Sequence, residues 1–311
     1  MKRLLTFVLS LLLLLSFASC GKKDKNGGKL KIVATIFPQY DIARTIAGDK
    51  AEVAMLLPWG SESHGYDPSV KDITAVSEAD VFLYTGDMTE PWAATLLKNA
   101  ESDADVPDIL KGITLIEGNG EHSADGDHSA DHVHDYDPHV WTSPKNAMIM
   151  TDNILAALCN ADPDNADYYR KNAESLQKEL EELDRELEEL SENSSGRTLY
   201  FGGRFAFIYM FSDYGFRYAS AYKGCSEESE PSIKVVSELC SAMEKDGAKY
   251  LFTEEMSEGK VAKGIAEETG ADLLELHSCH NLSSEDAKKG ETYISVMKRN
   301  IANIGIALEN K

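Results

Sequence analysis

The chain has 311 residues, enough for two ordinary domains with sizeable cores. It carries 53 Asp and Glu residues against 31 Lys and Arg residues, a formal net charge of −22. Such an acidic surface attracts cations and repels phosphate backbones, so we expect no nucleic-acid partner.

The N-terminus has the pattern of a secretory signal. A basic start is followed by an apolar run at residues 4–17, which is too short to span a membrane comfortably. Small residues then lead into Cys20, and this ending resembles a bacterial lipobox, in which the cysteine becomes the lipid-bearing first residue of the mature protein. We interpret residues 1–19 as a signal peptide and residues 20–28 as a lipidated flexible tether, so the folded part is expected outside the cytoplasmic membrane. The alternative is an ordinary signal peptide followed by an incidental cysteine.

Residues 29–162 alternate between short apolar segments and amphipathic segments. Near-continuous apolar strands that alternate with helices indicate a mostly parallel sheet with helices on both faces, so we expect an N-terminal α/β lobe. A loop at 119–138 interrupts it, because this stretch lacks Leu, Ile and Phe and is rich in Asp and His. The predicted strands are 30–37, 52–58 and 80–86, and the predicted helices are 39–48, 69–79, 91–100 and 143–161.

Residues 163–195 are the clearest helix of the sequence. Apolar residues recur in steps of four and three from Tyr169 to Leu190, which makes one continuous seam. Such a seam can pair two copies in a coiled coil, or one helix of about 42 Å can pack along two lobes. The flanking βα units favour the second interpretation, so we expect one rigid joining helix in a monomer.

Residues 196–311 repeat the alternation and predict a C-terminal α/β lobe of the same kind. The predicted strands are 197–203, 217–222, 249–255 and 272–277, and the predicted helices are 205–215, 232–247, 258–270 and 291–310.

Polar side chains gather where the predicted strands end. Because ligands of open α/β sheets bind outside the carboxyl ends of the strands, residues from both lobes are expected to meet at one rim. Imidazoles together with carboxylates suit Zn²⁺, and less strictly Mn²⁺. The residues in such positions are His64, His139, Arg204, Glu254, Glu255, His277 and His280.

Several motifs resemble those of one family, the zinc/manganese ABC-transporter substrate-binding lipoproteins, over nearly all of the mature chain. "LLPWGSESHGYDPSVKDI" and "DPHVWTSPKNA" are similar to its first and second ligand segments, and "EPW", "SEESEPS" and "YLFTEE" to other signatures. The resemblance implies His64 and His139 as metal ligands. It also implies capture of Zn²⁺, with Mn²⁺ as the alternative, in the cleft between the lobes, and delivery to a membrane permease driven by a cytoplasmic ATPase. No enzymatic activity is expected.

Two positions depart from the family pattern. Arg204 in "RFAFIY" stands where the family usually has His or Glu, and arginine cannot ligate a metal because it stays protonated. His277 stands where the family usually has Asp. We therefore expect a site of His64, His139 and His277, with Arg204 beside it, paired with Glu230 or Glu254. The fourth ligand is left open among Glu254, Glu255, His280 and water. A homologue that has lost the metal or binds an anion is the alternative.

The cysteines suggest one cross-link. Cys225 and Cys279 lie in turns next to these segments, and the extracytoplasmic compartment permits disulfides, so we expect a bridge between them. A cysteine ligand to zinc is the competing interpretation. Cys159 and Cys240 lie within helix patterns and are expected to be buried thiols.

The His-rich loop resembles one that zinc-specific members carry before the second ligand segment. We expect its histidines to act as auxiliary capture groups, and a solvated loop without a metal role is the alternative. The rival functions are a metallohydrolase, suggested by an incomplete "HVHDYD" motif, and a surface adhesin, suggested by the leucine seam. The auxiliary histidines are His122, His128, His132 and His134.

Overall fold

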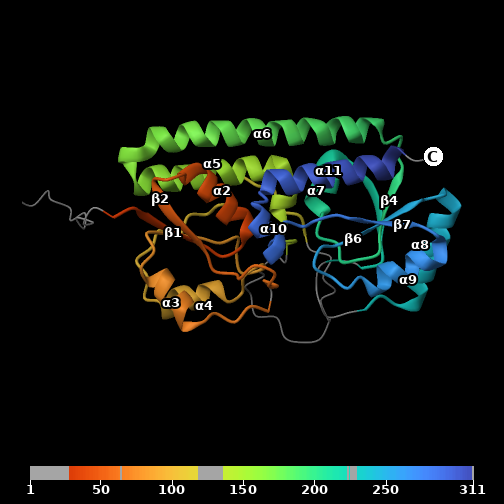
Figure 1. Ribbon diagram of the computed structural model, residues 1–311, viewed down its shortest axis with the longest axis horizontal. Coiled ribbons are helices and arrows are strands. Elements are labelled where there is room, and N and C mark those ends of the chain that lie inside the picture. Colours follow the sequence, from red (N-terminus) through yellow and green to blue (C-terminus); the bar gives the residue numbers. More distant parts are fainter. Residues whose placement is uncertain (1–27, 64, 118–135, 223, 225–229, 310–311) are drawn as a thin grey trace, which may run out of the picture.

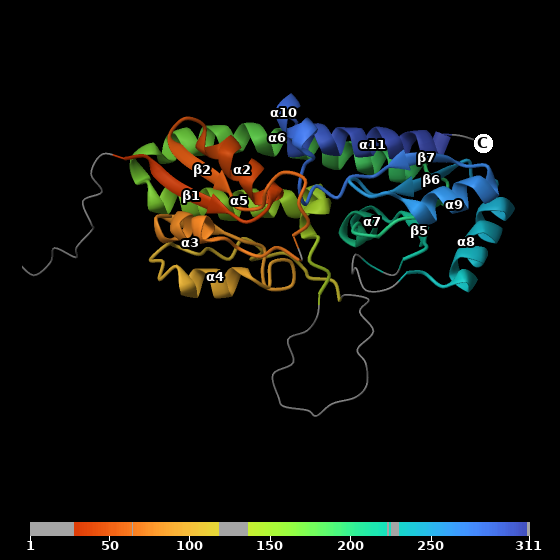
Figure 2. The same cartoon turned by 60° about the horizontal axis from the view of Figure 1, so that its bottom comes forward.

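The computed structural model describes residues 28–63, 65–117, 136–222, 224 and 230–309. Two α/β lobes lie side by side along one long helix, α6, as Figures 1 and 2 show, which confirms the predicted fold class. The strands are β1 (Leu30–Ala34), β2 (Ala51–Met55), β3 (Val81–Leu83), β4 (Thr198–Phe201), β5 (Arg217–Ser220), β6 (Tyr250–Thr253) and β7 (Asp272–Glu275). The α-helices are α2 (Phe37–Ala47), α3 (Val70–Ser77), α4 (Ala93–Asn99), α5 (Pro144–Ala161), α6 (Ala166–Asn193), α7 (Ile208–Tyr214), α8 (Ile233–Asp246), α9 (Lys260–Thr269), α10 (Ser284–Lys289) and α11 (Tyr293–Glu309).

The N-terminal sheet is parallel and has the order β2-β1-β3. Successive residues of a strand face opposite sides. Ile32 of β1 accordingly packs into the main core on the side of α2 and α5, whereas Val33 packs with Phe82 into a second core against α3 and α4. Because both faces are covered, the strands are mostly apolar, as their sequence indicated, with Lys31 of β1 and Glu52 of β2 as exposed exceptions.

The C-terminal sheet is parallel and has the order β5-β4-β6-β7. Phe201 and Phe252 lie on the face that belongs to the main core, where their rings stack with centroids 5.1 Å apart. Tyr200 and Leu251 face the opposite side and pack with residues of α8 and α9. The two sheets therefore share one main core, which includes the buried face of α6. Each lobe also has a smaller core of its own.

The long helix α6 connects the lobes physically. It packs against α2 and α5 in the N-terminal lobe and against α7 and α11 in the C-terminal lobe. Its seam is buried from Tyr169 to Leu187 within this one chain. The coiled-coil interpretation therefore fails, because the leucines that would face a second copy already form the shared core.

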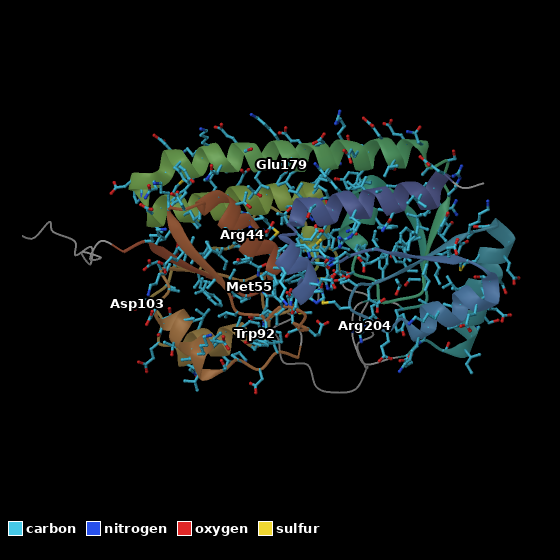
Figure 3. All side chains as sticks on the ribbon, in the orientation of Figure 1. Arg44, Met55, Trp92, Asp103, Glu179 and Arg204 are labelled. Carbon is cyan, nitrogen blue, oxygen red and sulfur yellow. The ribbon has the colours of Figure 1, made fainter. Side chains whose placement is uncertain are left out.

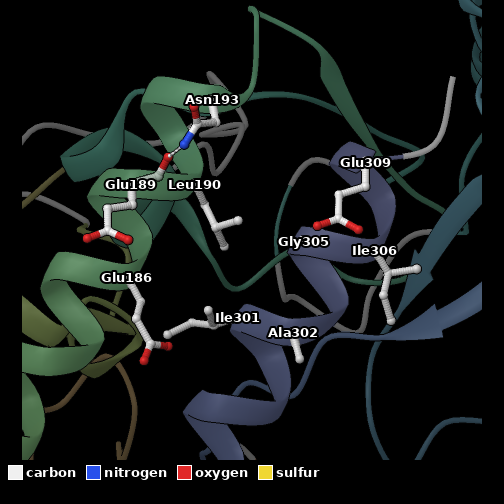
Figure 4. A pocket seen from close by; sticks show the side chains of 9 residues that line it. All are labelled: Glu186, Glu189, Leu190, Asn193, Ile301, Ala302, Gly305, Ile306 and Glu309. Carbon is white, nitrogen blue, oxygen red and sulfur yellow. Dashed lines mark hydrogen bonds between the residues drawn. The ribbon is translucent and has the colours of Figure 1, made fainter.

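A pocket of about 370 Å³ lies between the C-terminal parts of α6 and α11 (Figure 4). Leu190 and Ile301 face it, and Glu186, Glu189 and Glu309 line it as well. None of the residues predicted as metal ligands belongs to this lining.

The boundaries differ from the predictions in two instructive places. Helix α2 begins at Phe37, inside the predicted first strand, because Pro38 suits a first helical turn. Helix α10 was not predicted, because it is short and has no buried residue to give it a hydrophobic period. Among the helices described, none combines the length and the apolar character needed to cross a membrane.

Candidate metal centre

Several predicted functional residues lie outside the described part of the chain. These residues are Cys20, His64, His122, His128, His132, His134 and Cys225. The described part of the candidate centre therefore consists of His139, His277 and His280, the acidic residues near them, and the segments on either side of His64.

His139 is held by the residue two positions before it. Its ring Nδ1 and its backbone N–H both lie 2.9 Å from Oδ1 of Asp137, and only 3% of the side chain is exposed. A carboxylate accepts and cannot donate, so in the neutral imidazole Nδ1 carries the ring proton and Nε2 has the lone pair. A carboxylate behind the ring is the usual support for a metal-binding histidine.

Glu255 forms the centre of a buried polar cluster at the end of β6. Its Oε2 accepts the backbone N–H of Ser278 at 2.8 Å, and its Oε1 lies 3.2 Å from Nδ1 of His280 and 3.7 Å from Nδ1 of His277. Burial alone would raise the pKa of Glu255. The adjacent imidazoles and the hydroxyl of Ser278 outweigh burial and hold this pKa well below its usual range. Glu255 is therefore a buried negative charge that faces two imidazoles.

The two histidines of this cluster differ in what their rings can do. Nδ1 of His277 accepts the backbone N–H of Cys279 at 3.0 Å, and the amide of Asn300 pairs with both backbone groups of His277 at 2.8 Å. His280 instead turns Nδ1 toward Glu255 and places Nε2 3.7 Å from Oε2 of Glu62, two residues before His64. His277 is thus held as part of the loop structure, and His280 faces the first predicted ligand segment.

The loop 277–282 is tied to both other ligand segments. The side-chain amide of Asn281 donates to the carbonyls of Pro58 at 2.8 Å and Ser61 at 2.9 Å, and the backbone N–H of Gly60 donates to Leu282 at 2.8 Å. These hydrogen bonds hold the loop segment that precedes His64 against the loop that carries His280.

Trp141 makes the corresponding connection for the His139 segment. Its indole N–H donates to the carbonyl of Ser278 at 2.8 Å, and its ring lies edge-on to the ring of His139 with centroids 5.5 Å apart. Tyr293 in turn donates to the carbonyl of Trp141. Three segments that are distant in sequence therefore meet around one loop.

Within the described residues, no three His, Cys, Asp or Glu side chains are arranged so that they could hold a metal ion. His64, which would join them from the N-terminal lobe, is outside that set.

Arg204, Glu230 and Glu254 gather at a different place, a small crevice beside the ends of β4 and β6. The backbone N–H of Arg204 donates to Oε2 of Glu254 at 3.2 Å. Figure 3 places Arg204 on the side of the C-terminal lobe that faces the N-terminal lobe. Glu254 and Glu255 are neighbours, yet one carboxylate belongs to this crevice and the other to the histidine cluster.

The structure corrects the expected Cys225–Cys279 disulfide, because Cys279 is a free thiol. Its Sγ is completely buried and donates to the carbonyl of His277 at 3.6 Å, so the sulfur belongs to the core. Cys159 and Cys240 are also free thiols; Cys240 is buried as predicted, whereas Cys159 is only partly buried, contrary to the prediction.

Asp137, Trp141 and Ser278 were not predicted as parts of the centre. Asp137 had a local signal, because a carboxylate two residues before a histidine can reach the same ring. Trp141 and Ser278 had none, since 137 positions separate the two residues that bond.

Comparison with known proteins identifies the family. Residues 32–307 match the family model described as zinc-uptake complex component A, periplasmic (ZnuA). The chain is 34% identical over 283 residues to the high-affinity zinc uptake system protein ZnuA of Bacillus subtilis, covering 90% of this chain and 88% of that one. It is 32% identical over 305 residues to the zinc-binding lipoprotein AdcA of Streptococcus pneumoniae, covering 96% of this chain but only 59% of AdcA.

Similarity to solved structures supports the same family. The Zn(II)-bound ZnuA-like domain of Streptococcus pneumoniae AdcA has a TM-score of 0.75 and 30% identity, and the comparison covers 91% of this chain and all of that one, 100%. The laminin-binding protein Lmb of Streptococcus agalactiae, described as bifunctional with adhesin and metal-transporting activity, has a TM-score of 0.77 at 28% identity, over 91% of this chain and 100% of Lmb. The match of the family model over nearly the whole folded part, together with these relatives, shows that the chain belongs to the ZnuA family of zinc-uptake binding proteins.

Proposed function

We propose that the protein captures Zn²⁺ between its two lobes and delivers it to an ABC permease for uptake. The observation that carries this proposal is the loop 277–282, which binds the segment before His64 through Asn281 and the segment of His139 through Trp141. The names of relatives and the zinc-bound structure of the same fold support zinc as the cargo. The family consists of transport proteins, so the protein is not an enzyme and the hydrolase alternative is set aside.

We further propose His64, His139 and His280 as the imidazole ligands. His139 and His280 share one feature that His277 lacks, a carboxylate within hydrogen-bond distance of Nδ1: Asp137 at 2.9 Å from His139 and Glu255 at 3.2 Å from His280, against 3.7 Å from Glu255 to His277. This arrangement leaves Nε2 of each ring to bind the metal. His277, predicted as a ligand from its position after β7, is better explained as a positioning residue, because Nδ1 already accepts a backbone N–H. Water supplies the fourth ligand.

Three imidazoles favour Zn²⁺ over Mn²⁺, which prefers more oxygen ligands. The test uses protein stripped of metal with a chelator and competition between the two ions for a metal-sensitive dye. Zinc should bind more tightly than manganese, with one ion per chain. Equal affinity for the two ions would contradict the imidazole-rich site.

The cellular context is also part of the proposal. Cys20 would carry the lipid that anchors the protein on the outer side of the cytoplasmic membrane, and the partners would be a membrane permease and its cytoplasmic ATPase. The name of the relative AdcA as a zinc-binding lipoprotein supports the anchor. Labelling with a radioactive fatty acid should mark the wild-type protein and leave Cys20→Ala unlabelled.

The histidines of the loop are proposed to collect zinc weakly before it enters the cleft. His and Asp on a long tether make weak sites that exchange rapidly. Deletion of residues 120–135 should abolish weak additional zinc binding in calorimetry while the tight site remains. Loss of the tight site would contradict this division of roles.

Surface adhesion is a second candidate, supported by the likeness to the laminin-binding protein Lmb. The feature that first suggested it, the seam of α6, is buried and cannot contact a partner. Binding of the purified protein to immobilised laminin, measured with and without zinc, tests this candidate.

A further inference from the structure

The C-terminal lobe contains a second polar crevice at a defined point of its sheet. In the order β5-β4-β6-β7, the chain runs from β4 outward to β5 on one side and from β6 outward to β7 on the other. The position between β4 and β6 is therefore the topological switch point, where open α/β sheets bind small molecules at the carboxyl ends of their strands. A pocket of about 170 Å³ lies there, lined by residues that follow both strands.

Two glycines create the space at this point. A Cβ on Gly202 would approach the backbone of Ala262 to 2.7 Å, and a Cβ on Gly203 would lie 1.5 Å from Oε2 of Glu254. The missing side chains let Glu254 fold back onto the turn after β4, where Oε2 accepts the backbone N–H of Arg204. The turn, Arg204 and Glu254 thus form one side of the crevice.

The opposite side comes from β5 and the segments before α8 and α9. The hydroxyl of Tyr222 donates to Oε2 of Glu230 at 3.3 Å. Burial raises the pKa of Tyr222, the charges of Glu230 and Glu254 raise it further, and Arg204 lowers it, so all three charges act on one hydroxyl. Lys260 lies at the start of α9, at the exposed rim, and pairs with Glu258 at 3.0 Å. This pairing raises the pKa of Lys260, and the charge of Glu230 raises it further.

The lining restricts the chemistry of a ligand. It contains two positive side chains, Arg204 and Lys260, and three negative ones, Glu230, Glu254 and Glu258. A simple anion would meet the three carboxylates, and a simple cation would meet the guanidinium. A molecule that carries both charges can satisfy both signs, with the charge-assisted hydrogen bonds that are strongest in proteins. The volume corresponds to roughly six water molecules at about 30 Å³ each, which limits the ligand to a small one.

We propose that this crevice binds a small α-amino acid in its zwitterionic form. The carboxylate faces Arg204 and Lys260, and the ammonium group faces Glu230 and Glu254. The inference does not depend on zinc, because Glu255, the acidic residue of the histidine cluster, points away from this crevice toward Ser278.

The test is calorimetry on the metal-stripped full chain with glycine, L-alanine and L-serine. Propionate and ethylamine serve as matched probes, since each carries one of the two charges of L-alanine. We expect at least one amino acid to bind with a Kd below about 10 mM, and each fragment to bind at least about tenfold more weakly than L-alanine. The proposal is overturned if no amino acid of the panel binds or if a fragment binds as tightly as L-alanine.

Variants locate the site. Arg204→Met and Glu230→Gln should each weaken amino-acid binding by about tenfold or more, because each removes a charged hydrogen-bond partner. Lys263→Met is the matched control, since Lys263 is exposed on α9 outside the lining, and it should leave binding unchanged. Glu230 is exposed, so its variant keeps the test usable if Arg204→Met fails to fold. Binding unaffected by both variants would place the amino acid elsewhere and refute the assignment.

Discussion

Trp141 donates its indole N–H to the carbonyl of Ser278 over 2.8 Å, although 137 positions separate the two residues. Both groups are buried. This hydrogen bond joins the segment of His139 to the loop of His280. It therefore fixes the positions of these two proposed ligand segments relative to each other.

Trp141→Phe removes the indole N–H and keeps an aromatic ring beside His139. The carbonyl of Ser278 then loses a buried partner, which costs about 1–3 kcal/mol of folding free energy. Zinc affinity should also fall, because the two ligand segments are no longer connected directly. Urea unfolding followed by zinc titration measures both effects. Trp59→Phe is the control, since Trp59 is partly exposed, and it should change stability by less than about 0.5 kcal/mol.

Asp137→Asn tests the support behind His139. The amide oxygen can still accept Nδ1–H but carries no negative charge, so the imidazole is held less firmly and becomes a weaker ligand. Removal of such a support typically costs 10–100-fold in metal affinity, and we expect a loss of about that size for zinc. Circular dichroism should show an unchanged fold. An unaltered zinc affinity would mean that His139 binds no metal through Nε2.

His280→Ala and His277→Ala distinguish the two neighbouring histidines. Because His280 is proposed as a direct ligand, its replacement should lower zinc affinity more than the loss of the support from Asp137 does, by about 100-fold or more. His277→Ala should act mainly on stability, because the imidazole accepts the N–H of Cys279 inside the core. Thermal unfolding of the metal-free proteins separates the two effects. The reverse pattern, with His277 decisive for zinc and His280 dispensable, would restore the ligand set expected from the sequence.

Glu90 gives the protein a defined pH dependence of stability. Burial raises the pKa of Glu90 from 4.5 to about 7, against hydrogen bonds from Thr35, Thr85 and Gln39. Between pH 4.5 and about 7, the carboxyl group of Glu90 therefore keeps its proton in the folded state and loses it in the unfolded state. The stability that this proton contributes is present below pH 4.5 and is lost as the pH rises through about 7, by about 3 kcal/mol in total.

Glu90→Gln replaces the carboxyl group with a neutral group of similar shape. The difference in unfolding free energy between variant and wild type should rise from near zero at pH 4.5 to about 3 kcal/mol in favour of the variant at about pH 8. Urea unfolding across this range measures it. Glu101→Gln, at an exposed residue, is the control and should show no such trend. A constant difference between Glu90→Gln and wild type would show that folding does not raise the pKa of Glu90.

The sequence was sufficient for the fold because its signals are local. Continuous apolar strands indicated a parallel sheet in each lobe, and the spacing from Tyr169 to Leu187 marked the joining helix. Helix α10 was missed because its six residues bury nothing and rest on the cap of Ser283, which accepts the N–H of Asp286 at 3.0 Å.

The candidate site was predictable only as a list of residue types at strand ends. The sequence pointed to His277 because it ends the predicted strand 272–277, and His280 was only one of the choices for a fourth ligand. Strand position cannot reveal which ring nitrogen a backbone N–H already occupies. Similarly, Cys225 and Cys279 looked suitable for a bridge, but the sulfur of Cys279 is enclosed in the core.

By itself, the sequence determined two α/β lobes, a long joining helix and a surplus of imidazoles and carboxylates at the strand ends. These features follow from hydrophobic period and residue chemistry, which neighbouring residues carry. The tertiary structure decided which groups face one another: Glu255 toward His280, Trp141 toward Ser278, and Glu254 toward Arg204 in a separate crevice. Such choices depend on the orientation of individual side chains across contacts between distant segments, and no local pattern encodes them.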